Sequence, residues 1–275
     1  MAADIIQLKQ VTVGYPVRGG LFSRVRGYSK VLQAVDLAIP RGKTLGLVGE
    51  SGCGKTTLGR ALLGLVPVQS GEILYFPKQE SGGSPVSLHE LNEASFRPLR
   101  QKLQIVFQDP FSSLNPRLQV EEILTEGYRY HFPGKTAAER REACLAVLER
   151  VGLSRSSLDR YPHEFSGGQR QRISIARALI LEPDFVVCDE CVSALDVSIQ
   201  AQIINLLIDL QEELGLSYLF ISHDLAVVRH ISHDIAVIDA GKIVEYGPAS
   251  EVADRPRHEY TRKLIAAVPS LEPAL

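Results

Sequence analysis

Short apolar segments with strand-like alternation are interleaved along this sequence with longer segments of helical spacing. Residues 5–15 and 32–39 alternate apolar and polar side chains, which predicts two strands. Between them, residues 17–30 are rich in Gly and Arg, and we expect a solvated loop there. An apolar run at residues 45–48 leads through a glycine-rich turn into helical spacing that continues to Leu65. The first quarter of the chain therefore predicts strands followed by a strand–turn–helix unit.

The middle of the chain departs from this alternation. We predict a strand at residues 71–75, a loop leading to a short helix at 76–98, and a second strand at 103–107. Two helices follow at residues 120–130 and 137–151. Thr136 and Glu139 have the spacing of a capping box at the start of the second helix. Because helices here follow one another without strands, we expect an inserted helical subdomain at about residues 109–168.

Strands and helices alternate again in the last part of the chain. We predict helices at residues 169–181 and 199–214, strands at 185–188 and 217–222, and a short helix after His223. A hairpin of strands 235–238 and 242–246 and a final helix at 260–267 follow. We expect Gly215 to end the helix before the second of these strands. Strand–helix alternation predicts an α/β fold with a mainly parallel core sheet covered by helices on both faces.

Composition narrows the class of protein. A length of 275 residues with 45% hydrophobic residues suffices for one large α/β domain, or for a core with a subdomain. A net charge of −2 gives no support to global nucleic-acid binding, and we predict no nucleic-acid partner. No apolar run approaches the roughly 20 residues that span a bilayer, and the first residues lack a signal-peptide pattern. We therefore expect a cytoplasmic protein that reaches a membrane through a partner.

Four cysteines bear on possible metal or redox chemistry: Cys53, Cys144, Cys188 and Cys191. Disulfides are not expected in the cytoplasm. Cys188 and Cys191 form a C-x-x-C pair, which would suit a redox or zinc site. The chain offers no second C-x-x-C and no suitable His pair, so we favour small buried side chains instead.

The glycine-rich turn carries the clearest chemical signal. It fits the phosphate-binding pattern G-x-x-x-x-G-K-[ST] over Gly49, Glu50, Ser51, Gly52, Cys53, Gly54, Lys55, Thr56 and Thr57. Glycines let successive backbone N–H groups converge on an anion at a helix N-terminus. Lys55 would add a full charge toward the β and γ phosphates of ATP, and Thr56 would offer its hydroxyl to Mg²⁺. The alternative, a glycine-rich turn without a ligand, is disfavoured by the strand and helix that flank it.

A second strand delivers two carboxylates. Residues 185–188 form an apolar run, and Asp189 and Glu190 follow it directly. A phosphate-binding loop enzyme needs a carboxylate at the end of a second strand to hold Mg²⁺, which is the role we expect for Asp189. Glu190 is then placed to orient or deprotonate an attacking water. A salt-bridged surface Glu is the alternative.

A second potential anion site is formed by Ser166, Gly167, Gly168 and Gln169. Small residues there would expose N–H groups and a hydroxyl at the start of a helix. One nucleotide does not need two such sites in one chain. Two molecules associating head to tail would use both, each ATP lying between the phosphate loop of one and the Ser-Gly-Gly-Gln of the other. An ordinary Gly-Gly helix start is the alternative.

These motifs resemble those of the ATP-binding subunit of ABC transporters, over nearly the whole chain. Residues 49–57 match the Walker A motif, residues 185–190 match Walker B, and residues 165–169 match the signature motif LSGGQ, with Phe in place of Leu. The resemblance implies a P-loop NTPase fold with an N-terminal antiparallel β-subdomain. It also implies an ABC ATP-binding domain at residues 1–247 and a C-terminal tail helix at 248–275.

The resemblance assigns roles to four further residues. Gln108 matches the Q-loop and would contact Mg²⁺ or the attacking water while reporting to the helical subdomain. His223 matches the switch histidine and would contact the γ-phosphate; a buried helix-capping His is the alternative. Tyr15 lies where the family places an aromatic residue that stacks on adenine. Asp196 belongs to the D-loop and would act across the dimer.

A narrower resemblance is to the peptide/nickel importer branch of this family. It is carried by residues 107–117, 161–164, 192–197 and 258–261. In that branch two related ATPases drive two membrane permease subunits at the cytoplasmic face of the inner membrane, and a periplasmic binding protein delivers the solute. This chain departs by having Cys191 where Pro is usual, which could loosen the turn carrying Glu190. It also ends soon after the tail helix, so no iron–sulfur cluster is expected.

The resemblance thus predicts ATP hydrolysis by a head-to-tail dimer, coupled to the uptake of peptides or related small solutes. Nickel or another solute is the alternative cargo, and the second ATPase could be identical or a paralogue. An ABC ATPase acting in translation or DNA repair would usually carry tandem cassettes or coiled-coil arms, of which this sequence shows none. A P-loop kinase would lack the Ser-Gly-Gly-Gln element.

Overall fold

The computed structural model describes residues 4–19, 24–78 and 84–266. The chain divides into two compact units, one comprising Met1–Leu91 with Leu219–Leu275 and the other Asn92–Tyr218. Strand β8 (Ser217–Ile221) crosses the division. Among the helices that the structure describes, none combines the length and apolar character needed to cross a membrane.

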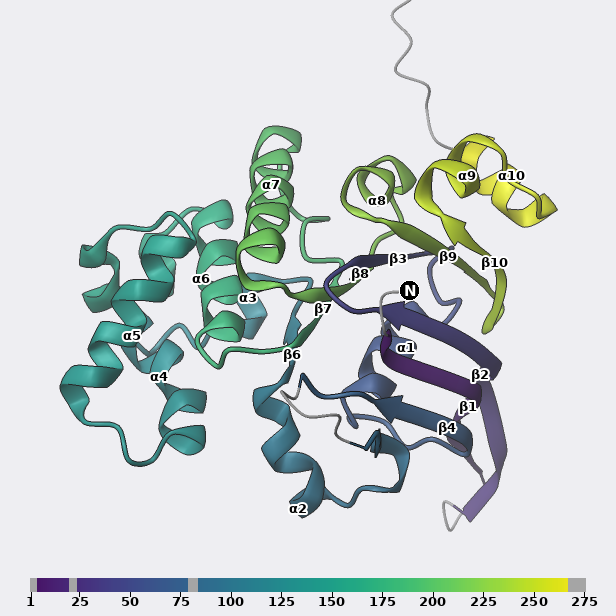
Figure 1. The fold of residues 1–275 in the computed structure, drawn as a ribbon, viewed down its shortest axis with the longest axis horizontal. Coiled ribbons are helices and arrows are strands. Elements are labelled where there is room, and N and C mark those ends of the chain that lie inside the picture. Colours follow the sequence, from purple (N-terminus) through teal and green to yellow (C-terminus); the bar gives the residue numbers. More distant parts are fainter. Residues whose placement is uncertain (1–3, 20–23, 79–83, 267–275) are drawn as a thin grey trace, which may run out of the picture. The chain divides into compact units, whose positions relative to one another are not determined.

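The first unit contains an antiparallel sheet of order β2-β1-β4-β5, of which Figure 1 labels β2, β1 and β4. Its strands are β1 (Asp4–Gly19), β2 (Arg24–Pro40), β4 (Ser70–Tyr75) and β5 (Val86–Ser87). The predicted loop at residues 17–30 is wrong for the described part, because Val17 pairs with Gly27 and Gly19 with Arg24. Backbone ladder bonds therefore hold a stretch whose Gly and Arg content suggested a loop.

The first unit also contains strands β3 (Thr44–Val48), β9 (Asp234–Asp239) and β10 (Lys242–Pro248). β3 and β9 are parallel, and β9 and β10 form the predicted antiparallel hairpin. In this unit the strand order is β10-β9-β3-β8, and every residue of β3 is buried. The continuous apolar run at 45–48 is thus explained by a strand covered on both faces.

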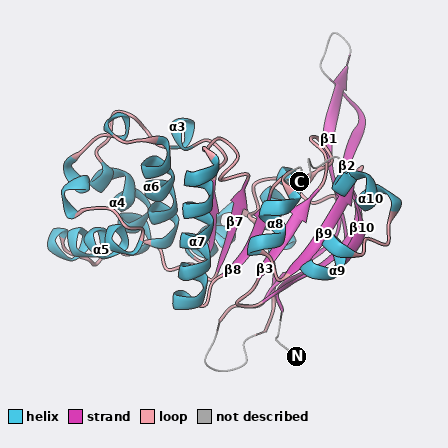
Figure 2. Ribbon diagram, turned by 90° about the horizontal axis from the view of Figure 1, so that it is seen from above, coloured by secondary structure: helices cyan, strands magenta, loops and turns pink. Residues whose placement is uncertain are grey.

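Among the described helices of the first unit, three follow strands directly and the last follows another helix. These helices are α1 (Lys55–Leu62), α8 (Leu225–Ile231), α9 (Ala249–Asp254) and α10 (Glu259–Ala266). α8 packs on β3, and α9 packs on β10 (Figure 2). α1 ends at Leu62, three residues before the predicted limit, and α9 was not predicted. A short 3₁₀ turn, η1 (Leu88–Glu90), completes the unit.

The second unit combines a pair of parallel strands, β6 (Leu103–Val106) and β7 (Phe185–Asp189), with a group of helices. The main helices are α4 (Val120–His131), α5 (Ala137–Arg150), α6 (Gly167–Leu179) and α7 (Val197–Leu214). Shorter elements are α2 (Glu93–Phe96), η2 (Arg97–Gln101), α3 (Pro110–Ser113), η3 (Arg155–Asp159) and η4 (Pro162–Glu164). α4, α5 and α6 pack on one another, and α6 packs on α7 (Figure 1).

Local signals fixed the ends of the long helices. The Thr136 side chain accepts a hydrogen bond from the Glu139 N–H, and Glu139 accepts from the Thr136 N–H, which confirms the predicted capping box at α5. Gly215 ends α7 in the left-handed conformation at φ +63°, as expected for a helix C-terminus. The start of α7 reaches two residues further back than predicted, to Val197.

Candidate nucleotide-binding site

The glycine-rich turn lies between β3 and α1, as predicted from the apolar run and the helical spacing. Gly54 precedes α1 with φ +113°, a conformation that side chains rarely adopt, and a Cβ there would lie 2.9 Å from Leu32 Cδ2. Gly49 has no room for a side chain either, because its Cβ would lie 2.2 Å from the Ile238 carbonyl oxygen. Both glycines are therefore required by the path of the backbone.

The start of α1 is arranged as an anion site. No side chain caps it, and its first turn carries no acidic residue. The first N–H groups of a helix have no partner within the helix, and the helix dipole adds partial positive charge there. The Lys55 ammonium lies at the same place, 5% exposed, and donates to the carbonyl oxygens of Gly49 at 2.7 Å and Glu50 at 2.9 Å. The Lys55 side chain is therefore folded back onto the loop itself.

The turn between β9 and β10 forms hydrogen bonds with the phosphate loop and with β2. Gly241 N–H donates to the Cys53 carbonyl oxygen at 3.0 Å, and the Gly241 carbonyl accepts from Gln33 N–H at 2.8 Å. A Cβ on Gly241 would lie 2.1 Å from the Val31 carbonyl oxygen, so only glycine fits. Burial raises the pKa of the Cys53 thiol, whose sulfur lies 4.0 Å from Lys55 Nζ. Cys53 is thus a packing residue of the loop.

His223 follows β8 in the first unit, and its side chain is exposed. The preceding residue, Ser222, donates its N–H to the Leu47 carbonyl oxygen at 3.3 Å, which fixes the end of β8 beside β3. The cap of α8 is Asp224, whose carboxylate accepts from the N–H groups of Ala226 and Val227. The alternative of a buried helix-capping histidine is therefore wrong.

Tyr15 lies in β1 opposite Ser29. Its side chain is 40% exposed, so its ring is open to a ligand rather than part of the core. A stacking role for this ring stays a prediction.

In the second unit the structure brings Gln108 and Glu190 together. Gln108 Nε2 donates to the Glu190 carboxylate at 2.8 Å, although 82 positions separate them in the sequence. β6 and β7 are parallel and adjacent, so the residues that follow them meet at one edge of the sheet. Asp189 is the last residue of β7 and is 8% exposed.

Glu190 has an unusual backbone conformation. Its φ is +48°, in the left-handed region that favours glycine. Its carbonyl oxygen accepts from Ser193 N–H at 3.1 Å and from Ser193 Oγ at 2.9 Å, which closes the turn after β7. Backbone strain of this kind is held only where surrounding contacts enforce it, and it is concentrated at functional sites.

The C-x-x-C pair flanks the two carboxylates. Cys188 and Cys191 are fully buried, and all four cysteines are free thiols. A hydrogen bond with the Cys191 thiol, followed by burial, raises the pKa of Cys188 well above its ordinary value. A buried thiol with a raised pKa is a poor nucleophile and a poor metal ligand, so Cys188 serves packing at the end of β7, and Cys191 is buried beside it.

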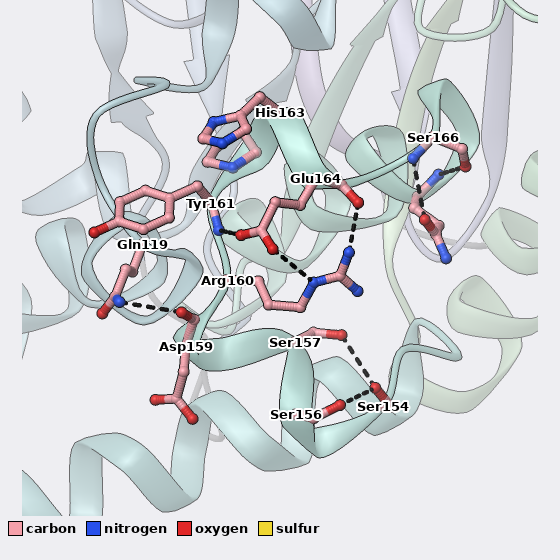
Figure 3. A network of polar contacts seen from close by, with 12 residues as sticks. Gln119, Ser154, Ser156, Ser157, Asp159, Arg160, Tyr161, His163, Glu164 and Ser166 are labelled. Carbon is pink, nitrogen blue, oxygen red and sulfur yellow. Dashed lines mark hydrogen bonds and ion pairs between the residues drawn. The ribbon is translucent and has the colours of Figure 1, made fainter.

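Ser166 and Gln169 form a reciprocal cap at the start of α6. Gln169 N–H donates to Ser166 Oγ at 3.3 Å, and Ser166 N–H donates to Gln169 Oε1 at 3.0 Å (Figure 3). A Cβ on Gly168 would lie 2.5 Å from Ile199 Cγ2, whereas a Cβ on Gly167 would lie 3.6 Å from Leu195 Cδ2. Gly168 therefore has a packing reason to be small, and Gly167 does not.

The segment before α6 is held by polar contacts within the second unit. Tyr161 N–H donates to the Glu164 carboxylate at 2.6 Å, and Arg160 forms an ion pair with the same side chain (Figure 3). The rings of Tyr161 and His163 stack with centroids 5.7 Å apart. Arg170 in α6 donates to the Pro162 carbonyl oxygen at 2.7 Å. These contacts fix the path of the chain into Ser166.

Sequence reasoning did not anticipate that α10 contacts the phosphate loop. The Tyr260 hydroxyl, in α10, lies 3.0 Å from the Glu50 backbone nitrogen, which donates to it. Residues 258–261 were singled out as a motif, but no role was assigned to Tyr260. The only signal in the sequence was the motif itself, since 210 positions separate the two residues.

Two family models match the chain. The model described as ABC transporter matches residues 32–193, and the one described as Oligopeptide/dipeptide transporter, C-terminal region, matches residues 244–275. The second match contains α9 and α10.

Curated relatives are similar along nearly the whole chain. The glutathione import ATP-binding protein GsiA of Pectobacterium atrosepticum is 50% identical over 274 residues, covering 99% of this chain and 42% of the relative. The protein of the same name from Escherichia coli is 49% identical over 272 residues, covering 98% and 42%. The chain thus spans about two fifths of the length of these relatives.

Solved structures share the fold. A dimeric post-hydrolysis state of the ATP-binding cassette MJ0796 bound to ADP and Pi has a TM-score of 0.75 and 28% identity, covering 89% of this chain and 98% of that one. The structure of cbiO1 from Clostridium perfringens, part of the ABC transporter complex cbiONQ, has a TM-score of 0.76 and 26% identity, covering 97% and 96%.

Proposed function

Since this chain belongs to the ABC transporter family, we propose that it is the ATP-hydrolysing subunit of an importer for peptides or related small solutes. The observation that carries the import assignment is the match of residues 244–275 to the oligopeptide/dipeptide transporter C-terminal region. Relatives that are about 50% identical are named for glutathione import, and glutathione is a small peptide. Peptide-like solutes are therefore the cargo class that we propose.

The phosphate loop is the proposed nucleotide-binding element. In this proposal the N–H groups of residues 49–57 and the Lys55 ammonium bind the phosphates of ATP. The exposed ring of Tyr15 stacks on the adenine, and His223 contacts the γ-phosphate. What supports these roles is the uncapped start of α1 and the buried, carbonyl-bound Lys55.

The donor set suits Mg²⁺. The Thr56 hydroxyl, the Asp189 carboxylate and the Gln108 amide oxygen are hard oxygen ligands, which Mg²⁺ prefers. When bound, Mg²⁺ neutralises charge on the β and γ phosphates. Among the described residues, no group of three or more His, Cys, Asp or Glu side chains could hold a metal ion by itself.

Glu190 is the proposed general base. Its carboxylate accepts the Gln108 amide hydrogen, and this bond restricts its rotation. An oriented carboxylate can accept a proton from a water that attacks the γ-phosphorus. Gln108 is therefore a positioning residue for Glu190 in this proposal, besides its predicted contact with Mg²⁺ or water.

The proposed working unit is a head-to-tail dimer. Ser166, Gly167, Gly168 and Gln169 of one chain would close on the ATP held by the other, with Asp196 acting across the interface. Similarity to a dimeric cassette solved with ADP and Pi supports this arrangement. The partner would be an identical or paralogous ATP-binding subunit.

The remaining assignments follow from the importer proposal. Residues 1–247 are the proposed ATP-binding domain, residues 109–168 its helical subdomain, and residues 248–275 the tail. The helical subdomain would contact two membrane permease subunits at the cytoplasmic face of the inner membrane, and its motion would be transmitted to them. A periplasmic or surface binding protein would deliver the solute.

The test is ATP hydrolysis by the assembled transporter. The chain is purified with its permease subunits and binding protein in lipid, and glutathione, a dipeptide and a nickel chelate are added in turn. We expect a peptide to stimulate hydrolysis, and the Glu190→Gln assembly to remain unstimulated. Stimulation by the nickel chelate and by neither peptide would overturn the proposed cargo class. A rate of hydrolysis that is unchanged by every solute and by the permease subunits would overturn the importer assignment.

A further inference from the structure

We propose that Tyr260 is a positioning residue of the nucleotide site, which ties the C-terminal helix α10 to the phosphate loop. The proposal rests on the phosphate loop binding ATP. Its observation is the hydrogen bond from the Glu50 N–H to the Tyr260 hydroxyl oxygen, at 3.0 Å. Both residues belong to the first unit.

Glu50 is important for the loop because its backbone carbonyl oxygen also binds the Lys55 side chain. The Glu50 carbonyl oxygen accepts from Lys55 Nζ at 2.9 Å and from Cys53 N–H at 3.3 Å. Tyr260 therefore fixes the peptide unit before Glu50, and the carbonyl after it fixes the lysine. A loop that is held in one conformation before ATP arrives loses less conformational entropy on binding.

Tyr260 is itself held in place by β10. The Glu245 carboxylate accepts from Arg257 N–H at 2.7 Å and from His258 N–H at 3.0 Å. His258 Nδ1 in turn accepts from Tyr260 N–H at 3.2 Å. These bonds fix the turn that begins α10, so the tyrosine hydroxyl reaches the loop from a defined backbone position.

The chemistry of a tyrosine suits this position. Burial raises the pKa of Tyr260 above its ordinary value, so the hydroxyl is neutral at physiological pH. A neutral oxygen accepts the Glu50 N–H without placing a negative charge next to a loop that binds phosphates. A carboxylate at the same place would repel the nucleotide. The neutral Tyr260 hydroxyl thus stabilises the loop without repelling the phosphates of the nucleotide.

The experiment compares two variants that each remove one hydroxyl. Tyr260→Phe keeps the ring and loses the acceptor for Glu50, and Tyr246→Phe, at an exposed position of β10, is the matched control. The dissociation constants of ATP and ADP with Mg²⁺ are measured by calorimetry on the full chain. One lost hydrogen bond predicts an increase of about fivefold for Tyr260→Phe and no change for Tyr246→Phe.

Two further readouts separate positioning from a merely structural role. We expect the melting temperature of nucleotide-free Tyr260→Phe to fall by no more than one lost hydrogen bond accounts for, while the increase in melting temperature on adding ATP is smaller than for the parent. In the assembled transporter, the KM for ATP should rise and kcat should stay unchanged. A lower melting temperature with unaltered nucleotide affinity, or unaltered affinity altogether, would overturn the proposal.

A measurement on the unaltered chain covers the case in which the variant does not fold. Hydrogen exchange should show the Glu50 amide to be protected, because its N–H is bonded. Rapid exchange at Glu50 would overturn the proposal. If the parent chain fails to bind ATP, the proposed function itself fails, which is a separate result from normal ATP binding that ignores Tyr260.

Discussion

Gln108 and Glu190 are joined by a hydrogen bond of 2.8 Å from the amide nitrogen to the carboxylate. They follow neighbouring parallel strands, and Glu190 is held with φ at +48°. An acidic side chain whose backbone and carboxylate are both constrained has few orientations. This is the arrangement that a general base requires, because proton transfer depends on a defined distance and angle.

Replacing Glu190 by Gln should keep ATP binding and reduce turnover. The amide is nearly the same size and its oxygen still accepts from Gln108, but it cannot take a proton from water. We expect kcat to fall by about 10²–10⁴-fold, the range of general-base catalysis. Nucleotide affinity and phosphate release are measured on the same preparation. Near-normal hydrolysis would remove Glu190 from this role.

Replacing Gln108 by Ala should leave the carboxylate present but less well oriented. A hydrogen bond to a charged group contributes more than a neutral one, so we expect kcat to fall by about tenfold. ATP affinity should change less than kcat, as expected for a residue that acts through Glu190. Adding Gln108→Ala to Glu190→Gln should then have little further effect. Additive losses in this double-variant cycle would show that Gln108 acts independently.

Gly167 and Gly168 form a matched pair for separating stability from function. Alanine at 168 must displace Ile199, whose Cγ2 would lie 2.5 Å away, and we expect the free energy of unfolding to fall by about 1–3 kcal/mol. Alanine at 167 meets only an ordinary contact at 3.6 Å, so stability should be kept. If the signature segment closes on a second chain's ATP, Gly167→Ala should still impair hydrolysis. Full activity of stable Gly167→Ala would argue against that closure.

Glu139 predicts a pH-dependent contribution to stability. Hydrogen bonds from the Thr136 N–H, then from Lys135 and the Thr136 hydroxyl, lower the pKa of its carboxyl from 4.5 to about 2. A carboxyl with a lowered pKa stabilises the folded state fully above its unfolded pKa, and this contribution is lost as pH falls from about 4.5 toward 2. The difference in urea midpoint between the parent and Glu139→Gln should therefore shrink on acidification. Glu142→Gln, on the same helix, removes a carboxylate outside the capping box and is the control that isolates the contribution of Glu139.

Much of this fold was predictable because its signals are local. Thr136 with Glu139, the apolar run before Gly49 and the glycine at 215 each specify a helix end or a strand from a few neighbouring residues. The long arms of β1 and β2 were not predictable, because backbone pairing between residues 17 and 27 depends on the register of two strands and not on side-chain pattern.

Sequence motifs named the residues of the candidate site but not the contacts among them. Phosphate-loop, Walker B and signature residues could be named because each motif is contiguous. The bonds from Gln108 to Glu190 and from Glu50 to Tyr260 join residues 82 and 210 positions apart, and periodicity carries no information at that separation. The left-handed conformation of Glu190 had no sequence signal either, since glycine or asparagine would be the usual residue there.

The junction at Gly241 has a consequence for how this cassette can vary. Main-chain atoms of Gln33, Gly241 and Cys53 connect the antiparallel sheet, the hairpin turn and the phosphate loop in series. Both of these bonds join main-chain atoms, and the Gln33 side chain adds a bond to the Ala240 carbonyl oxygen at 3.0 Å. Substitutions at 33 and 53 that leave the backbone path unchanged should therefore keep the two main-chain bonds. Alanine at 241 would instead force the three segments apart, so a single methyl group there should uncouple them.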